Sequence, residues 1–139
     1  MANTSATIKD VNDFLTQMKL CLTMLGGHVF YNTREKNKQL MAQMDWYKED
    51  QKKEWLLKLE AGDYYEGPDA NEQPGLSSVW KFGKRIKGHL CYIKIFLQKP
   101  NVVCISFHLA EHDMYLPLKN ITEIFSSVTK ETHSKAFFL

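Results

Sequence analysis

Hydrophobic and polar positions follow two different spacings along this chain. In the N-terminal part, apolar residues recur every three or four positions, which is typical of amphipathic helices. This spacing predicts a helix over about residues 8–24. Thr7 is placed to cap its start, Asp10 lies in the first turn where the helix dipole favours an acid, and Gly26-Gly27 is expected to end it.

Two further helices are predicted before the spacing changes. One spans residues 34–44, after a short extended piece at 28–31, and the other spans about residues 46–60. The expected buried stripe of the longer helix consists of Trp55, Leu56 and Leu59. Its expected solvated lysines are Lys52, Lys53 and Lys58. Residues 61–75 are rich in Gly, Pro, Asp and Asn and are predicted to form a long loop, and such loops are often functional.

Apolar and polar residues then alternate, which is typical of half-buried strands. The pattern predicts strands over residues 79–86 and 90–97 and a third strand ending at His108. A turn at Lys87-Gly88 joins the first two, and Lys99-Pro100-Asn101 is expected to form the next loop. The fold class is therefore predicted to be α+β, with N-terminal helices packed on a small antiparallel sheet.

The two turns also predict which residues face one another. Lys81 is expected opposite Lys94, and Tyr92 opposite His108, with Ser106 on the same face because side chains alternate along a strand. The other face is predicted to be apolar and to carry Ile93, Ile95, Val103, Ile105 and Phe107.

The polar face of this predicted sheet carries an imidazole, a phenol and two ammonium groups. The ordinary pKa of imidazole, ~6.5, suits proton transfer near neutral pH. Like charges directly opposite each other destabilise a sheet, so Lys81 and Lys94 invite an anion between them. Structural roles stay open at this point: a histidine capping a strand end, a tyrosine packing on the sheet, and solvated lysines.

Composition narrows the class of protein. The 139 residues suggest one domain over 1–139, and the net charge of +2 permits nucleic-acid binding without arguing for it. Cys21, Cys91 and Cys104 lie in apolar runs without metal-ligand spacing, which predicts buried thiols in a reducing compartment and no zinc site. No secretory signal or membrane-spanning run is visible, so we expect a cytoplasmic protein.

Five short motifs follow one another within this organisation. They are Arg34-Glu35-Lys36-Asn37, Asp63-Tyr64-Tyr65-Glu66-Gly67-Pro68, Val79-Trp80-Lys81-Phe82-Gly83-Lys84, Tyr92-Ile93-Lys94 and Ser106-Phe107-His108-Leu109-Ala110-Glu111. In this order they resemble the MqsR family (motility quorum-sensing regulator), toxins of type II toxin–antitoxin systems. The resemblance covers roughly residues 26–119 and implies a fold similar to RelE-like ribonucleases, metal-independent cleavage of messenger RNA, and inhibition by a cognate antitoxin. Residues 120–139 form an extension that allows a C-terminal helix.

The resemblance also suggests roles for individual residues. Tyr92 and Lys94 match the sheet tyrosine and lysine of the family. Lys81 stands where the best-known type of member has glutamine, His108 where lysine is often found, and Glu66 in place of a lysine. These departures are consistent with a branch that uses histidine for proton transfer.

The predicted function is therefore that of an endoribonuclease toxin without metal or cofactor. The predicted catalytic residues are His108, Tyr92, Lys94, Lys81 and Glu111. The predicted RNA-binding residues are Lys84, Arg85, Lys87 and Tyr65. The expected partners are an RNA substrate and an antitoxin protein, with a homodimer left open and no membrane. Two alternatives remain: a non-catalytic module that binds protein or nucleic acid through the same face, and a metal-dependent enzyme using His108, Glu111 and His112.

Overall fold

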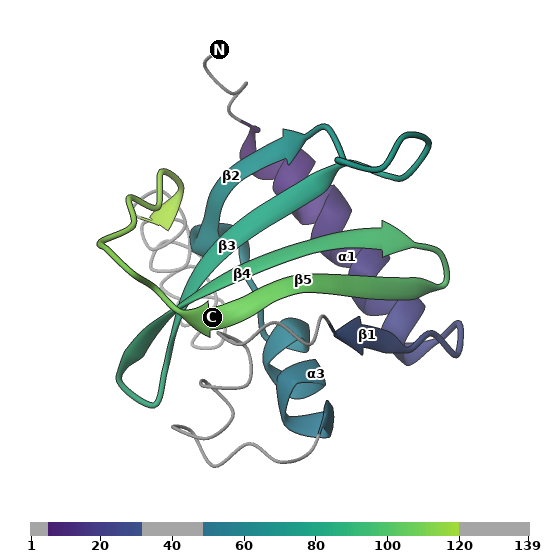
Figure 1. Cartoon of the computed structure of the whole chain (residues 1–139), viewed down its shortest axis with the longest axis horizontal. Helices are drawn as coiled ribbons and strands as arrows, with labels where there is room; N and C mark the ends of the chain where they lie inside the picture. The colour runs from purple at the N-terminus through teal and green to yellow at the C-terminus, as the bar shows by residue number, and fades with distance from the viewer. Residues whose placement is uncertain (1–5, 32–48, 120–139) are drawn as a thin grey trace, which may run out of the picture.

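The computed structural model of the chain describes residues 6–31 and 49–119. It has an α+β fold in which a helix packs against a five-stranded sheet, with the strand order β1-β5-β4-β3-β2 (Figure 1). The predicted helix at 34–44 and the extension 120–139 lie outside the described residues. Within the described residues, no helix combines the length and the apolar character that crossing a membrane requires.

The sheet is mixed, whereas the sequence predicted an antiparallel one. Four strands that follow one another along the chain each pair antiparallel with the next: β2 (Tyr64–Asp69), β3 (Val79–Ile86), β4 (His89–Gln98) and β5 (Asn101–Leu109). The short β1 (Val29–Tyr31) pairs parallel with β5 at the edge of the sheet. It is the extended piece predicted at 28–31, and its start is held to β5 by two bonds: the His28 N–H donates to Asn101 Oδ1, and the Val102 N–H donates to the His28 carbonyl oxygen.

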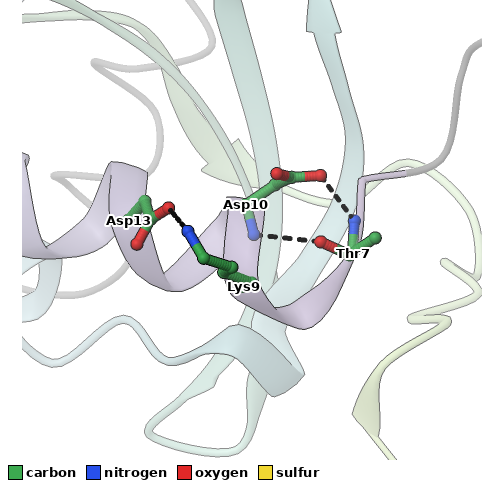
Figure 2. Close-up of polar contacts among 4 residues, drawn as sticks. All are labelled: Thr7, Lys9, Asp10 and Asp13. Carbon is green, nitrogen blue, oxygen red and sulfur yellow. Dashed lines mark hydrogen bonds and ion pairs between the residues drawn. The ribbon is translucent and has the colours of Figure 1, made fainter.

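The first helix, α1 (Ile8–Thr23), confirms the prediction in position and in capping. Figure 2 shows the reciprocal bonds at its start: the Thr7 N–H donates to the Asp10 carboxylate at 3.0 Å, and the Asp10 N–H donates to the Thr7 hydroxyl at 3.1 Å. Lys9 pairs with Asp13 on the exposed side, with 2.8 Å between Nζ and Oδ2. The two bonds between Thr7 and Asp10 satisfy backbone N–H groups that a helix start leaves unpaired.

The core lies between α1 and one face of the sheet, behind the strands in Figure 1. Phe14 stacks on Trp80 with 4.6 Å between ring centroids. Burial of each large apolar side chain contributes roughly 1.5–3 kcal/mol, so this layer supplies most of the stability. Its fully buried members include Val11, Met18, Leu56, Leu59, Phe82, Ile93, Ile95 and Phe107.

The helix α3 (Glu49–Leu57) lies within the predicted third helix, but one of its lysines does not face solvent. Lys52 is only 2% exposed, and its Nζ lies 4.9 Å from the ring centroid of Tyr31 and 5.6 Å from that of Phe107. The prediction of a solvated Lys52 is therefore wrong. The physical reason is helical spacing, because Lys52 precedes Trp55 and Leu56 by three and four positions and so falls on their buried side.

The segment predicted as a loop at 61–75 contains two regular elements. A short 3-10 helix, η1 (Ala61–Asp63), leads into β2, which pairs with β3 in an irregular register. Tyr64 is buried, and its hydroxyl donates to the Gly67 carbonyl and accepts the Ala6 N–H at 3.2 Å. Gly67 has a φ of +111°, and a Cβ there would lie 2.7 Å from the Val79 carbonyl oxygen, so glycine is required for the pairing. A shorter loop at 70–78 remains.

The β3–β4 hairpin has the predicted register. Lys81 pairs with Lys94 and Phe82 with Ile93 across the turn at Lys87-Gly88. Both turn residues have positive φ, 52° and 83°, which is the geometry of the tight turn that matches strand twist.

The β4–β5 hairpin agrees with the prediction only at one end. Tyr92 pairs with His108 and Lys94 with Ser106, as expected. At the other end Gln98 pairs with Asn101, so the loop is one residue shorter than predicted, and an irregularity after Lys94 restores the register. Consequently Val102 and Cys104 are buried in the core, while Val103 and Ile105, predicted there, line the opposite face.

All three cysteines are buried free thiols, as predicted. Burial raises the pKa of Cys91 to about 11 and that of Cys104 to about 12. Both thiols therefore stay protonated at neutral pH and act as small apolar side chains.

Candidate functional site

The side of the sheet opposite α1, here called the site face, carries the residues predicted to do chemistry. Strand alternation brings Lys81 from β3, Tyr92 and Lys94 from β4, and Ser106 and His108 from β5 to this face. The prediction of a shared polar face is confirmed, since the imidazole at 108 lies beside the phenol at 92 and points away from the core.

A hollow of about 370 Å³ opens on the site face around His108, and it is called the His108 hollow below. Five of the predicted site residues line it together: Tyr65, Tyr92, Lys94, His108 and Glu111. His112, expected to act only in the metal-dependent alternative, also lies in its wall. The other residues there were not predicted to act: Glu66, Ser106, Ala110 and Met114. The hollow thus joins groups from β2, β4, β5 and the segment after β5.

Aromatic rings form one side of the His108 hollow. The rings of Tyr92 and His108 are stacked, with 5.3 Å between centroids and 23° between planes. The ring of Tyr65 meets that of Tyr92 edge-on, at 6.4 Å and 77°. This packing limits the rotation of the imidazole, because one of its faces is held against the phenol ring.

The backbone fixes which nitrogen of His108 carries a proton. Nδ1 lies 2.8 Å from the Leu109 carbonyl oxygen, and a carbonyl oxygen can only accept a hydrogen bond. Nδ1–H is therefore the donor, and the neutral imidazole keeps its lone pair on Nε2. A base oriented in this way can take a proton from a group bound in the hollow.

Tyr92 is held in its neutral form. Burial raises the pKa of its phenol, and the nearby Glu66 carboxylate adds to the effect, while the Lys81 ammonium opposes it. A neutral phenol can donate a hydrogen bond to an oxyanion, so Tyr92 is suited to stabilise negative charge rather than to act as a base.

The two opposed lysines have different surroundings. Lys81 Nζ lies 3.3 Å from Glu66 Oε2 and 3.2 Å from Asp69 Oδ2, both on β2. Burial favours the neutral amine, but attraction to Asp69 and Glu66 outweighs it, so the pKa of Lys81 is raised. Lys94 forms no ion pair with any described residue. The negative charge expected between the two lysines is thus supplied at Lys81 by two carboxylates of the chain itself. The ammonium of Lys94 remains available to bind a ligand.

A glycine lets the segment after β5 cross the site face beside Tyr92. Gly83 pairs with Tyr92, and a Cβ on Gly83 would lie 3.0 Å from Sδ and Cε of Met114. A larger residue would push Met114 away. The close approach of Met114 holds residues 110–114 against the sheet and places Glu111 and His112 at the hollow.

The remaining predicted RNA-binding residues lie away from the His108 hollow. Lys84 shares the α1 side of β3 with Phe82, and its Nζ donates to Asp63 Oδ2 at 3.0 Å. Arg85 is exposed near the end of β3, and Lys87 is exposed in the turn. Of the predicted RNA-binding residues, only Tyr65 therefore belongs to the hollow.

Sequence reasoning missed Glu66 and Asp69 as partners of Lys81, because it placed them in a loop. The opposed lysines were a usable signal, since two ammonium groups across a strand pair require an acid nearby. Among the described residues, no group of three or more His, Cys, Asp or Glu side chains is gathered closely enough to hold a metal ion. His108, Glu111 and His112 do not form such a group.

The arrangement on the site face is therefore a half-buried base of fixed tautomer, a neutral phenol and a cation, all lining one hollow. A scan against models of protein families, a search of curated proteins and a search of solved structures each found no match to the chain.

Proposed function

We propose that this chain is a metal-independent endoribonuclease that cleaves messenger RNA and acts as the toxin of a type II toxin–antitoxin system. The ribose 2′-oxygen attacks the adjacent phosphorus, and the bond from phosphorus to the 5′-oxygen breaks. The products are a 2′,3′-cyclic phosphate and a free 5′-hydroxyl. The observation that carries the proposal is the His108 imidazole, whose Nε2 is left as acceptor in a hollow shared with Tyr92 and Lys94.

In this mechanism His108 is the general base. Its Nε2 takes the proton of the 2′-hydroxyl as the oxygen attacks, while Nδ1–H stays bonded to the Leu109 carbonyl. The stack against Tyr92 keeps the ring in place, and such orientation lowers the entropy cost of reaching the transition state.

Lys94 and Tyr92 stabilise the charge that develops on the phosphate. The ammonium of Lys94 is available because the carboxylates of β2 are engaged with Lys81. The neutral phenol of Tyr92 gives its proton to the departing 5′-oxygen, which leaves as a hydroxyl without building up negative charge. Lys81 acts indirectly, because its ion pairs offset the negative charge of Asp69 and of Glu66, which lines the hollow that takes the substrate phosphate.

The assignment to a toxin is supported by the order of motifs along the chain. Four of the five motifs that resemble the MqsR family lie in the described residues, and they build β2, β3, β4 and the end of β5. Of these elements, β2, β4 and β5 line the His108 hollow, and β3 contributes Lys81 to the same face of the sheet, so the segments that carry the resemblance also carry the candidate site.

The first experiment incubates the purified chain with a defined single-stranded RNA in excess EDTA. Cleavage is expected to persist, with products that end in a 2′,3′-cyclic phosphate and a 5′-hydroxyl, detected by mass spectrometry. His108→Ala is expected to lower the rate by ~10²–10⁴-fold, the usual range for loss of a general base. His28→Ala is the matched control, because His28 is exposed and precedes β1, near the other end of β5.

Two results would count against the proposal. Loss of cleavage in EDTA, restored by a divalent cation, would favour the metal-dependent alternative. RNA binding without cleavage, equal in wild type and His108→Ala, would favour the non-catalytic module. Induction of the wild-type and His108→Ala genes in parallel tests the toxin role, since only the wild type is expected to arrest growth.

A further inference from the structure

A further hollow of about 470 Å³ lies next to the His108 hollow, and Met114 lines both. It is called the Arg85 hollow below. Arg85 on β3 and Leu90 on β4 pair with each other and form the part of its wall that belongs to these two strands. Leu90 lies two residues from Tyr92 on β4, and strand geometry puts their Cα atoms about 7 Å apart. One nucleotide of an extended single strand can bridge this separation, so a strand bound in the His108 hollow can continue into the Arg85 hollow.

Tyr115 contributes a largely exposed aromatic ring to the Arg85 hollow. The side chains of Met114 and Leu116 both lie over Gly83 on β3, at 3.0 and 3.2 Å from the position that a Cβ would take there. Tyr115 lies between them in the chain and is 78% exposed. Its two neighbours therefore hold the segment against the sheet and leave the phenol ring accessible. Bases of single-stranded RNA commonly stack on rings presented in this way.

Arg85 gives this hollow a cation that suits a phosphate. Its side chain is exposed and forms no ion pair with any described residue. Lys84, also in the wall, is by contrast held by Asp63, with 3.0 Å between Nζ and Oδ2. The carboxylate of Asp113 lies in the wall as well, but it is exposed, so water weakens its repulsion of an anion. A guanidinium binds a phosphate through two parallel hydrogen bonds.

We infer that the Arg85 hollow binds a nucleotide next to the scissile phosphate, with a flanking phosphate on Arg85 and the base stacked on Tyr115. The inference rests on the proposed ribonuclease activity and extends substrate recognition to a neighbouring nucleotide of single-stranded RNA. With the scissile phosphate beside Lys94 and His108, the strand passes Met114 to reach this second position.

The first test removes the charge of one phosphate at a time. The bond that wild type cuts in a defined RNA is mapped, and each of the two phosphates flanking it is replaced in turn by an uncharged methylphosphonate. The ribose before the replaced group carries a 2′-O-methyl group, and a strand with this methyl group alone is the reference. Wild type is expected to lose roughly tenfold in kcat/KM with one of the two replacements, because a hydrogen bond between charged groups is lost.

Arg85→Gln shows whether Arg85 is the partner of that phosphate. This variant is expected to cleave the reference strand roughly tenfold more slowly than wild type and to be insensitive to the methylphosphonate. Lys99→Gln is the matched control, because Lys99 is exposed in the turn between β4 and β5 and lines neither the His108 hollow nor the Arg85 hollow. It is expected to keep the sensitivity of wild type.

Tyr115→Ala tests the contact with the base. It is expected to lower kcat/KM roughly tenfold when the flanking nucleotide carries a base and to leave cleavage of a strand with an abasic residue there unchanged. Tyr115→Phe keeps the ring and is expected to cleave both strands as wild type does. Circular dichroism checks the fold of each variant.

The outcomes separate this inference from the proposed function. If wild type cleaves no RNA, both are wrong. If wild type cleaves RNA but neither methylphosphonate slows it, or if Arg85→Gln stays as sensitive as wild type, the inference is wrong and the ribonuclease proposal stands. The same holds if Tyr115→Ala slows the strands with and without the base equally.

Discussion

Phe107 and His108 are neighbours on β5, but their side chains lie on opposite faces of the sheet. Phe107 is fully buried among Ile93, α1 and the Lys52 ammonium. His108 is half-buried, stacks on Tyr92 and lines a hollow. The same strand thus supplies one residue to the core and the next to the candidate site.

This difference shows how a small domain separates stability from chemistry. The α1 side of the sheet buries large apolar groups, so its side chains are packed on all sides and changes in volume are costly. The site face holds polar groups with specific partners, whose loss alters protonation and charge more than packing. Side chains alternate between the two faces along a strand. Substitutions one position apart are therefore expected to change different properties: stability on the α1 side, and protonation and charge on the site face.

Phe107→Ala tests the core side of this comparison and has the largest expected effect. Removing the ring leaves a cavity under the sheet, and the free energy of unfolding is expected to fall by about 3–5 kcal/mol. His108→Ala, one position further, is expected to change stability by less than ~1 kcal/mol. Urea denaturation followed by circular dichroism measures both variants.

The distinction between the two faces would be wrong if the changes in the free energy of unfolding of the two variants were reversed. A large loss in His108→Ala with little change in Phe107→Ala would mean that the imidazole is a structural residue and that the core lies elsewhere. In that case any loss of cleavage in His108→Ala would report on folding and could not be assigned to proton transfer.

The β3–β4 hairpin shows what the sequence can predict of this fold. Lys87-Gly88 admits one tight turn, and both strands alternate regularly, so the pairing of Lys81 with Lys94 follows directly. The β4–β5 hairpin is predictable only near His108, because a shorter loop and an irregular pairing near Ile105 compensate each other. Such irregularities depend on backbone geometry and packing, which side-chain alternation does not record.

Ion-pair partners that lie on irregular elements could not be predicted from the sequence. β2 contains Gly and Pro and pairs with β3 in a shifting register, so its pattern is that of a loop and hides Glu66 and Asp69. The pairing of Tyr92 with His108 could be predicted, while the opposed lysines indicated only that an acid lies near them and not which residues supply it. The burial of Lys52 was missed for another reason. Its charge led to the prediction of a solvated side chain, although its helical spacing indicated burial.

Lys94 and Lys81 allow a second comparison, this time within the site face. They are the same kind of residue and pair across neighbouring strands, but among the described residues only Lys81 has carboxylate partners. Lys94→Gln is expected to lower kcat for RNA cleavage by ~10²–10³-fold, as loss of one charge-stabilising donor does elsewhere, with little change in stability. Lys81→Gln leaves Glu66 and Asp69 without their cation, and the free energy of unfolding is expected to fall by about 1–2 kcal/mol.

The two measurements are single-turnover cleavage and urea denaturation on both variants. Equal losses of cleavage, with equal stability, would show that the lysines share the substrate phosphate and that the carboxylates of β2 release Lys81 when RNA binds. The distinction drawn between the two ammonium groups would then be wrong.

Thr7→Ala has the smallest expected effect and tests whether the two faces are independent. It removes the hydroxyl that caps α1, and the free energy of unfolding is expected to fall by about 1 kcal/mol. Bonds from Thr7 lower the pKa of Asp10, so this carboxylate stabilises the folded state above the ordinary carboxyl pKa of ~3.9 and loses that contribution as the pH falls through its lower folded value. Thr7→Ala keeps the backbone N–H that lowers this pKa most and loses only the smaller side-chain contribution. The gap in stability between wild type and Thr7→Ala is therefore expected to narrow only slightly in acid, as thermal unfolding at several pH values would show. The rate of RNA cleavage at neutral pH is expected to stay unchanged, because α1 contacts the sheet only on the side away from His108. Slower cleavage by a folded Thr7→Ala protein would contradict this, since it would mean that strain at the helix passes through the sheet to the site.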